Sequence, residues 1–159
     1  MGDITSQEVI KDLKKLGNQN TEYPIEPNIN ILETFKAPSL KLFTVKFVQE
    51  HNEFSSICPK SHQPDFATIK ILYSPSNVCI ESKSLKLYLF SYRNSKGFGE
   101  HITNKIADDL QAVLNSRWLV VIGDFSPRGG LRWVSKVIRN SVDVCDLFDY
   151  EKLMIAEFN

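Results

Sequence analysis

The sequence lacks an excess of charge of either sign. Its 159 residues contain 19 Lys+Arg and 19 Asp+Glu, which gives a formal net charge of zero. A protein that grips a nucleic-acid backbone needs surplus lysine and arginine to neutralise phosphates, so the balance disfavours direct nucleic-acid binding. Because no net charge keeps the copies apart, self-association is expected.

Cysteines and long apolar runs are also scarce. The three cysteines, Cys58, Cys79 and Cys145, form no C-x-x-C pair. They fit neither a disulfide framework nor a four-ligand zinc site, and we expect free thiols in a reducing cytoplasm. No apolar run reaches the 18 or so residues of a membrane span, and residues 1–17 lack the apolar centre of a secretory signal.

The composition that remains is that of one ordinary globular domain, with 42% hydrophobic and 24% charged residues. Alternating apolar residues predict strands, and a 3.6-residue period predicts helices. The predicted strands span residues 40–48, 67–73, 117–125 and 131–138, and the predicted helices span 6–16, 82–94 and 100–115. The segment 53–66 contains two prolines and is expected to be a long functional loop, and 126–130 a turn.

The order of these elements after residue 40 is ββααββ. Strands and helices that are segregated in this way predict an α+β domain with an antiparallel sheet and both helices on one face. We expect residues 1–39 to form a helix and an arm, 40–139 the catalytic domain, and 140–159 a tail.

Cys58 is the most reactive candidate of the predicted loop. A thiolate is the nucleophile of cysteine chemistry, and a cationic neighbour such as Lys60 favours it. Asp65 suits a general acid when it is partly desolvated. The alternative is that Cys58 is a small buried hydrophobe and Asp65 a turn residue, since buried free cysteine is common. Cys79 and Cys145 are expected to be structural.

Three cations are candidates for binding an anion. Lys83 and Lys86 lie three residues apart, so both ammonium groups can reach one anion near the start of the first core helix. Arg128, in a Pro-Arg-Gly-Gly turn, stands beside exposed backbone amides and suits a phosphate cradle. The alternative for the lysine pair is a solvated helix face. A Rossmann-type nucleotide site is not expected, because no G-x-G-x-x-G follows a strand.

Glu100 begins the second core helix after a turn with two glycines. A carboxylate there can accept two N–H bonds from the edge of a guanine-type base. The alternative is that Glu100 only interacts favourably with the helix dipole. His62 and His101 are expected at the surface, and the scattered histidines predict no metal site.

Four segments together resemble one family. Residues 54–69 (FSSICPKSHQPDFATI) resemble the catalytic loop of the NADPH-dependent 7-cyano-7-deazaguanine reductases, the nitrile reductases of queuosine biosynthesis. Residues 81–88 (ESKSLKLY) resemble the signature motif of that family, and 127–130 (PRGG) and 16–19 (LGNQ) also match it. The similarity extends over about residues 15–132. The single copy of each motif is typical of the unimodular branch of the family.

The resemblance implies the tunnelling fold and a covalent mechanism. Cys58 would add to the nitrile carbon to form a thioimide, and Asp65 would donate a proton to the nitrile nitrogen. The co-substrate would be NADPH, and no metal would be required. The family also implies a cytoplasmic homo-oligomer, two stacked pentamers with active sites between the subunits.

The resemblance also assigns binding residues. Gly99 and Glu100 would contact the base of the substrate, and Ile80, Glu81 and Ser82 would line its pocket. The phosphates of the cofactor would be held by three cations, Lys83, Lys86 and Arg128.

One position departs from the family pattern, which usually has His-Glu where this chain has Gly99-Glu100. Glycine handles no protons, and His101 lies roughly 100° around the helix from Glu100. Two alternatives stay open. One is an amidine-forming relative that adds ammonia to the same nitrile within tRNA; the lysine-rich motif of residues 81–88 and the lack of a basic surplus weigh against it. The other is a pterin- or purine-binding tunnelling-fold protein without activity, which only the missing histidine supports.

Overall fold

The computed structural model describes residues 23–38 and 43–139, and all that follows concerns these ranges. The helix predicted over 6–16, the start of the strand predicted from residue 40, Cys145 and the tail 140–159 lie outside them. The elements are η1 (Ile29–Ile31), β1 (Thr34–Lys36), β2 (Val45–Ile57), β3 (Pro64–Ser74), β4 (Val78–Ile80), α2 (Ser82–Phe90), η2 (Ser91–Asn94), α3 (Gly99–Leu114), β5 (Trp118–Arg128) and β6 (Leu131–Arg139).

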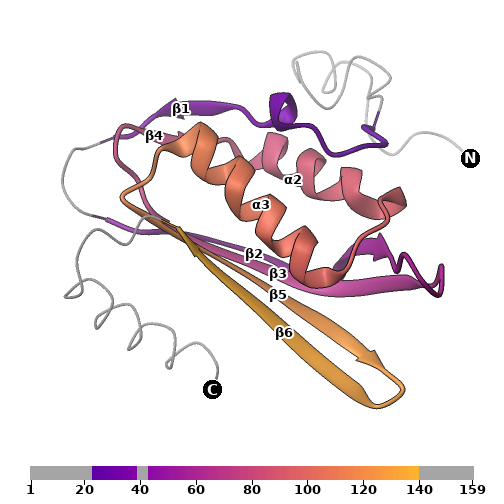
Figure 1. Cartoon of the computed structure of the whole chain (residues 1–159). Helices are drawn as coiled ribbons and strands as arrows, with labels where there is room; N and C mark the ends of the chain where they lie inside the picture. The colour runs from indigo at the N-terminus through magenta and orange to yellow at the C-terminus, as the bar shows by residue number, and fades with distance from the viewer. Residues whose placement is uncertain (1–22, 39–42, 140–159) are drawn as a thin grey trace, which may run out of the picture.

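Four strands form one antiparallel sheet in the order β2-β3-β5-β6. Helices α2 and α3 both cover the same face of this sheet (Figure 1). The α+β class, the antiparallel sheet and the placement of both helices are therefore confirmed. A second sheet, formed by β1 and β4, is not predicted from the sequence, because strands of three residues are too short to show a period.

The core lies between the sheet and the helices. Alternate residues of β3 point at the helices, and the apolar stripe of α3 points back at the sheet. These residues are at most 5% exposed: Ala67, Ile69, Ile71 and Tyr73 from β3, and Ile102, Ile106, Leu110 and Leu114 from α3. Buried residues recur every second position in the strand and about every 3.6 positions in the helix, which explains why both the strand and the helix can be predicted from the sequence.

The long loop predicted over 53–66 is wrong. Strand β2 continues to Ile57 and β3 begins at Pro64, so only residues 58–63 connect them. The pairing skips from Gln49 to Phe54, and between them His51 and Asn52 have positive φ values of 58° and 55°. This irregularity breaks the period-2 pattern, which hides the second half of the strand.

The first core helix is also shorter than predicted. Helix α2 ends at Phe90, and residues 91–94 form a 3₁₀ turn. The N-terminal cap of α2 is Glu81, whose carboxylate accepts hydrogen bonds from the N–H groups of Lys83 at 2.9 Å and Ser84 at 2.7 Å. Two of the unpaired donors at the start of the helix are thereby satisfied from within the chain.

A buried polar network joins the helical segments behind the sheet. The Tyr88 hydroxyl lies 2.7 Å from the Tyr92 hydroxyl and donates to Asp109 at 2.7 Å. Lys105 donates to both oxygens of Asp109 at 2.8 Å. The ring of Tyr92 packs on Phe54 of β2, with centroids 5.7 Å apart. The network therefore fixes α2, η2 and α3 relative to β2, the strand that directly precedes Cys58.

Candidate active site

Cys58 and Asp65 lie at the two sides of the β2–β3 hairpin. Cys58 directly follows β2, and Asp65 is the second residue of β3. The hairpin is closed by hydrogen bonds from Cys58 N to Gln63 O at 2.9 Å and from His62 N to Cys58 O at 3.0 Å. Cys58 is half-buried and Asp65 is 5% exposed. A rigid turn thus presents a thiol beside a nearly buried carboxylate.

Arg128 connects this hairpin to β5. Its Nη1 donates to Asp65 Oδ1 at 2.5 Å, and its Nη2 donates to Ser61 Oγ at 2.7 Å and to Gln63 Oε1 at 3.3 Å. The turn predicted over 126–130 is shorter than expected, because β5 continues to Arg128, which pairs with Leu131. The guanidinium is therefore carried by the end of a strand, directly against the two candidate catalytic groups.

The surroundings of Cys58 favour its thiolate. The pKa of the thiol is lowered from 9.0 to about 6 by the hydrogen bond of the Ser61 side chain, then by the N–H groups of Ser61 and Lys60, and by Arg128. At neutral pH most of this cysteine is ionised, whereas an ordinary thiol is almost entirely protonated. The interpretation of Cys58 as an inert core residue does not fit these surroundings.

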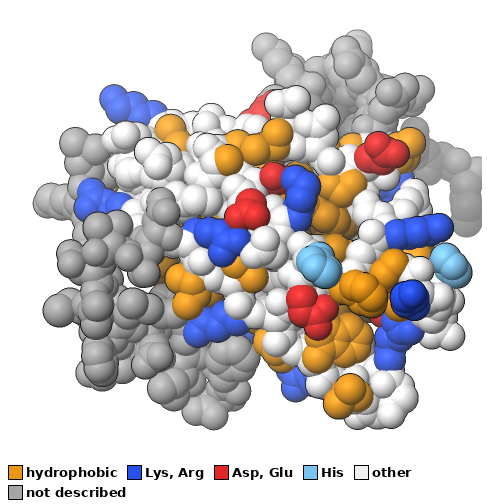
Figure 2. Space-filling model, in the orientation of Figure 1, with side chains coloured by type: hydrophobic (Ala, Val, Ile, Leu, Met, Phe, Trp, Pro, Cys, Tyr) orange, Lys and Arg blue, Asp and Glu red, His pale blue; other side chains and the backbone are white. Residues whose placement is uncertain are grey.

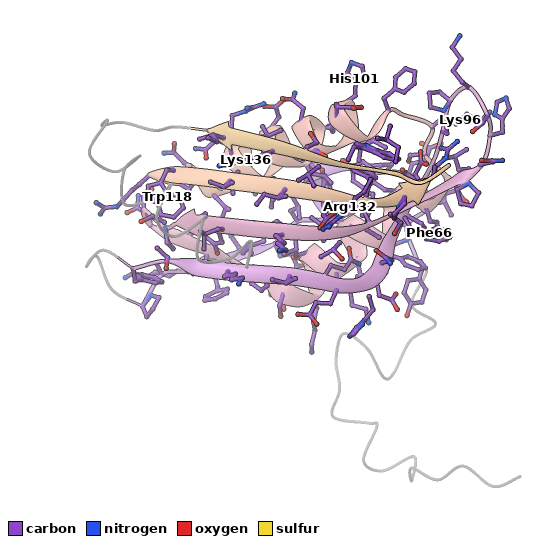
Figure 3. The ribbon with its side chains drawn as sticks, turned by 90° about the horizontal axis from the view of Figure 1, so that it is seen from below. Phe66, Lys96, His101, Trp118, Arg132 and Lys136 are labelled. Carbon is purple, nitrogen blue, oxygen red and sulfur yellow. The ribbon has the colours of Figure 1, made fainter. Side chains whose placement is uncertain are left out.

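The predicted substrate-binding pair, Gly99 and Glu100, lies at the same end of the molecule. The segment before it runs beside Ile57: Ile57 N donates to Ser95 O at 2.9 Å, and Gly97 N donates to Ile57 O at 3.1 Å. Figure 3 shows Lys96 of this segment and Phe66 of β3 at one end of the sheet, and Trp118 at the other. Glu100 is exposed in the first turn of α3. The exposed carboxylate of Glu100 is available to a ligand.

Gly99 is packed too closely to carry a side chain in this arrangement. A Cβ atom built at Gly99 would lie 2.6 Å from Cζ of Phe125. The Phe125 ring is fully buried and stacks on Trp133 with centroids 5.2 Å apart and an interplanar angle of 2°. The ring of Phe125 therefore occupies the space into which a histidine at position 99 would extend, and any side chain there requires this stack to move.

The remaining predicted substrate residues lie away from Cys58. Ile80 is buried, and its N–H donates to the hydroxyl of Tyr73 at 3.1 Å. Tyr73 and Asp65 are on one strand, eight residues apart, which corresponds to about 26 Å at the usual rise. Glu81, next to Ile80, caps α2. One chain therefore does not bring Ile80 and Glu81 to Cys58.

Ser82 and Lys86 line a hollow of about 210 Å³ between α2 and the strands β2 and β3. Lys83 is exposed in the first turn of the same helix. These two lysines suit a phosphate group as point charges. The N–H groups of the helix start are less suitable, since Glu81 already engages two of them. Figure 2 shows basic and acidic side chains interspersed on the face that carries the helices.

Sequence reasoning missed Ser61 and Gln63, which join Arg128 to the hairpin, and Ser56. Ser56 is fully buried opposite Asp65, and its hydroxyl has no partner among the described residues. The only signal for Ser61 and Gln63 was their position between Cys58 and Asp65.

Within the described ranges, no group of three or more acidic, histidine or cysteine residues is arranged to hold a metal. No helix there is long and apolar enough to cross a bilayer.

Comparison with known proteins bears on the family. Residues 64–142 match the family described as QueF-like protein. The NADPH-dependent 7-cyano-7-deazaguanine reductase of Streptococcus mutans is 51% identical over 127 residues, which are 79% of this chain and 77% of that protein. The protein of the same name from Bacillus cytotoxicus is 51% identical over 126 residues, 78% of this chain and 74% of that protein.

A solved structure is similar in fold. The apo form of the archaeosine synthase QueF-Like superposes with a TM-score of 0.56 at 20% identity, covering 66% of this chain and 99% of that chain. This likeness supports the predicted tunnelling fold and nothing finer. The names of the sequence relatives agree with the expected enzyme class, an oxidoreductase, and with the expected co-substrate, NADPH. The chain belongs to the family of the NADPH-dependent 7-cyano-7-deazaguanine reductases.

Proposed function

We propose that this protein uses NADPH to reduce the nitrile of 7-cyano-7-deazaguanine to the aminomethyl group, through a thioimide on Cys58, in queuosine biosynthesis. One observation carries the proposal: an ionisable thiol and a nearly buried carboxylate are held in one hairpin by one guanidinium. The names of relatives that are about half identical support the substrate and the cofactor. The cytoplasm stays the expected location.

The covalent step follows from the residues of the hairpin. The sulfur of Cys58 attacks the nitrile carbon and a C–S bond forms, while one π pair of the C≡N bond moves to nitrogen. The nitrogen then takes a proton, for which the proposed donor is Asp65 in its protonated form, since a carboxylate has no proton to give. The product is a neutral thioimide. Its linkage to the protein keeps the reactive carbon in place for reduction.

The reduction steps that follow need a hydride donor and residues that bind the base of the substrate. Two molecules of NADPH, bound one after the other, would each supply one hydride, the first for the thioimide and the second for the imine that remains after the thiolate of Cys58 leaves. Lys83 and Lys86 are the proposed partners of its phosphates. Glu100 is the proposed acceptor for the N–H groups of the base edge, since it is exposed three residues after Gly97, whose N–H donates to Ile57 O.

We further propose that the site is completed by a second copy of the chain. Ile80 contacts Tyr73 near the end of β3, whereas Cys58 lies by the start of that strand, so one chain does not enclose a substrate with both. In a homo-oligomer the two ends of neighbouring chains can meet. The family implies a ring of two stacked pentamers. The net charge of the chain is zero, so electrostatic repulsion between copies does not oppose such an assembly.

Mixed oligomers test the shared site. Cys58→Ala and Lys83→Ala chains are dissociated, mixed and reassembled, and NADPH oxidation is followed at low NADPH concentration. If the two residues serve one site from different chains, random pairing restores activity to about a quarter of the unmodified rate. A site within one chain gives only the mean of the two parent rates, which would contradict the proposal.

The function itself is tested in two steps on the full chain. First, the protein is incubated with 7-cyano-7-deazaguanine alone, and its intact mass is measured. Second, NADPH is added and its oxidation is followed. We expect the mass of one substrate on each chain, followed by NADPH consumption. An adduct without oxidation would indicate the amidine-forming alternative, and the absence of any adduct would indicate a binding protein without this chemistry. Either result overturns the proposal.

A further inference from the structure

Arg128 forms several hydrogen bonds with the β2–β3 hairpin that carries Cys58. A residue that served only to bind a phosphate would not need these bonds. Nη1 of Arg128 donates to Asp65, and its Nη2 donates to both Ser61 and Gln63. The three bonds use both hydrogens of Nη2 and one of Nη1. The side chain of Arg128 is 32% exposed and that of Asp65 is 5% exposed, so the carboxylate of the pair is nearly buried and the guanidinium is partly open to water.

The backbone holds the guanidinium at this place. Arg128 is the last residue of β5 and pairs with Leu131 of β6. Between them, Gly129 and Gly130 adopt φ values of 58° and 83°, in the left-handed region where other residues are strained. The two-residue turn thus fixes where β5 ends, and with it the point from which the Arg128 side chain extends.

The contact with Ser61 has a consequence for Cys58. A serine hydroxyl has one hydrogen to donate and two lone pairs to accept with. Because Ser61 Oγ accepts from Arg128, its hydrogen is directed away from the guanidinium and serves the sulfur of Cys58, to which Ser61 is hydrogen-bonded. Arg128 therefore acts on the sulfur through Ser61 as well as directly.

We propose that Arg128 is a positioning residue for thioimide formation, and that its guanidinium holds Ser61 on the sulfur of Cys58 and the carboxylate of Asp65 beside it. The inference rests on the proposed function, in which Cys58 and Asp65 act on the nitrile. It differs from the assignment of Arg128 to cofactor phosphates. A phosphate ligand affects only steps that involve NADPH, whereas a positioning residue affects Cys58 when no NADPH is present.

The first experiment measures the reactivity of Cys58 without substrate or cofactor. The rate of its alkylation by iodoacetamide is measured against pH in the full chain by peptide mass. Thiolate is the reactive form, so the rate of the unmodified protein rises through about pH 6 and is level above it. In Arg128→Ala we expect the midpoint to move upward by about half a pH unit or more, because Arg128 and the Ser61 contact both stabilise the thiolate.

The surroundings of the sulfur bear on this profile. Its charged and titratable neighbours on the adjoining elements are Lys60 and His62 on the turn, Asp65 on β3, Arg128 on β5 and Lys96 of the segment paired with Ile57. In Arg128→Lys we expect a midpoint between those of the unmodified protein and Arg128→Ala, because an ammonium keeps the charge without the planar fork. Both variants are compared by their unfolding midpoints in urea, so that a damaged fold is recognised.

The second experiment measures adduct formation with 7-cyano-7-deazaguanine in the absence of NADPH. We expect Arg128→Lys to slow it by about tenfold or more, since the fork geometry that orients Ser61 and Asp65 is lost. The control is Arg132→Ala in the β5–β6 hairpin that also carries Arg128; it removes an arginine that is paired with another aspartate, Asp124. Its alkylation profile and its adduct rate should equal those of the unmodified protein.

The results separate the inference from the proposed function. An unchanged alkylation midpoint in both Arg128 variants, or an unchanged rate of cofactor-free adduct formation, overturns the positioning role and leaves the reductase proposal standing. If the unmodified protein forms no adduct, the proposed function fails, and the role of Arg128 in thioimide formation fails with it. If a raised KM for NADPH were the sole defect of the Arg128 variants, the positioning role would be wrong, and Arg128 would be assigned to the phosphates of the cofactor.

Discussion

Replacing Cys58 with alanine is expected to abolish the adduct with 7-cyano-7-deazaguanine and to reduce NADPH oxidation with this substrate by about 10³-fold or more. The reason is that no bond to the nitrile carbon forms without the sulfur, and hydride transfer to a free nitrile lacks the activated thioimide. Intact mass and the loss of NADPH absorbance measure the two effects in the same sample.

The matched control for this change is Cys79→Ala. Cys79 is the other cysteine of the described ranges, a free thiol that is buried in β4. Its replacement should leave the adduct and the oxidation rate close to those of the unmodified protein. If Cys58→Ala continued to oxidise NADPH in a substrate-dependent manner, the covalent mechanism would be wrong, whatever the family.

Asp65→Asn is expected to reduce the rate of adduct formation by about 10²- to 10⁴-fold, the usual contribution of a positioned proton donor. Asparagine has nearly the same shape as aspartate, and its carbonyl oxygen can still accept the hydrogen bond from Arg128. It has no acidic proton to give to the nitrile nitrogen. Stopped mixing followed by intact mass at successive times measures the loss.

Two further measurements make this result specific. Asp124→Asn is the control, because Asp124 is also an aspartate paired with an arginine of the β5–β6 hairpin. Alkylation of Cys58 by iodoacetamide needs no proton donor, so Asp65→Asn should retain it. A variant that formed the adduct at the unmodified rate would show that Asp65 donates no proton in this step.

Gly99, which replaces the histidine of the family pattern, is tightly packed in the fold, and the sequence does not show this packing. The glycine looks like the loss of one histidine from an otherwise complete motif. In the fold, the rings of Phe125 and Trp133 fill the neighbouring space, and Cζ of Phe125 lies 2.6 Å from where a Cβ would be. Residue 99 is therefore coupled to β5 and β6, which come later in the chain.

The hairpin around Cys58 shows where prediction from sequence stops. The two prolines of residues 53–66 suggested a loop, but the backbone pairs Ser56 with Asp65 and Phe54 with Ala67. Serine contributes little to hydrophobic periodicity, so the pattern is silent although the strand is present. Cys58 and Asp65 were chosen as candidates for the site from the sequence, while the paired strands that carry them were missed.

The sequence by itself determined the class of the fold, the sites of most strands and helices, and the identity of Cys58, Asp65 and Glu100 as candidates. These features depend on local periods and on motifs that are contiguous in the chain. Only the tertiary structure decided that Arg128 bears on Cys58 and Asp65, and that Ile80 and Glu81 stand apart from them. The reason is that these relations depend on strand register and on where β3 and β5 end, which pair residues distant in the chain.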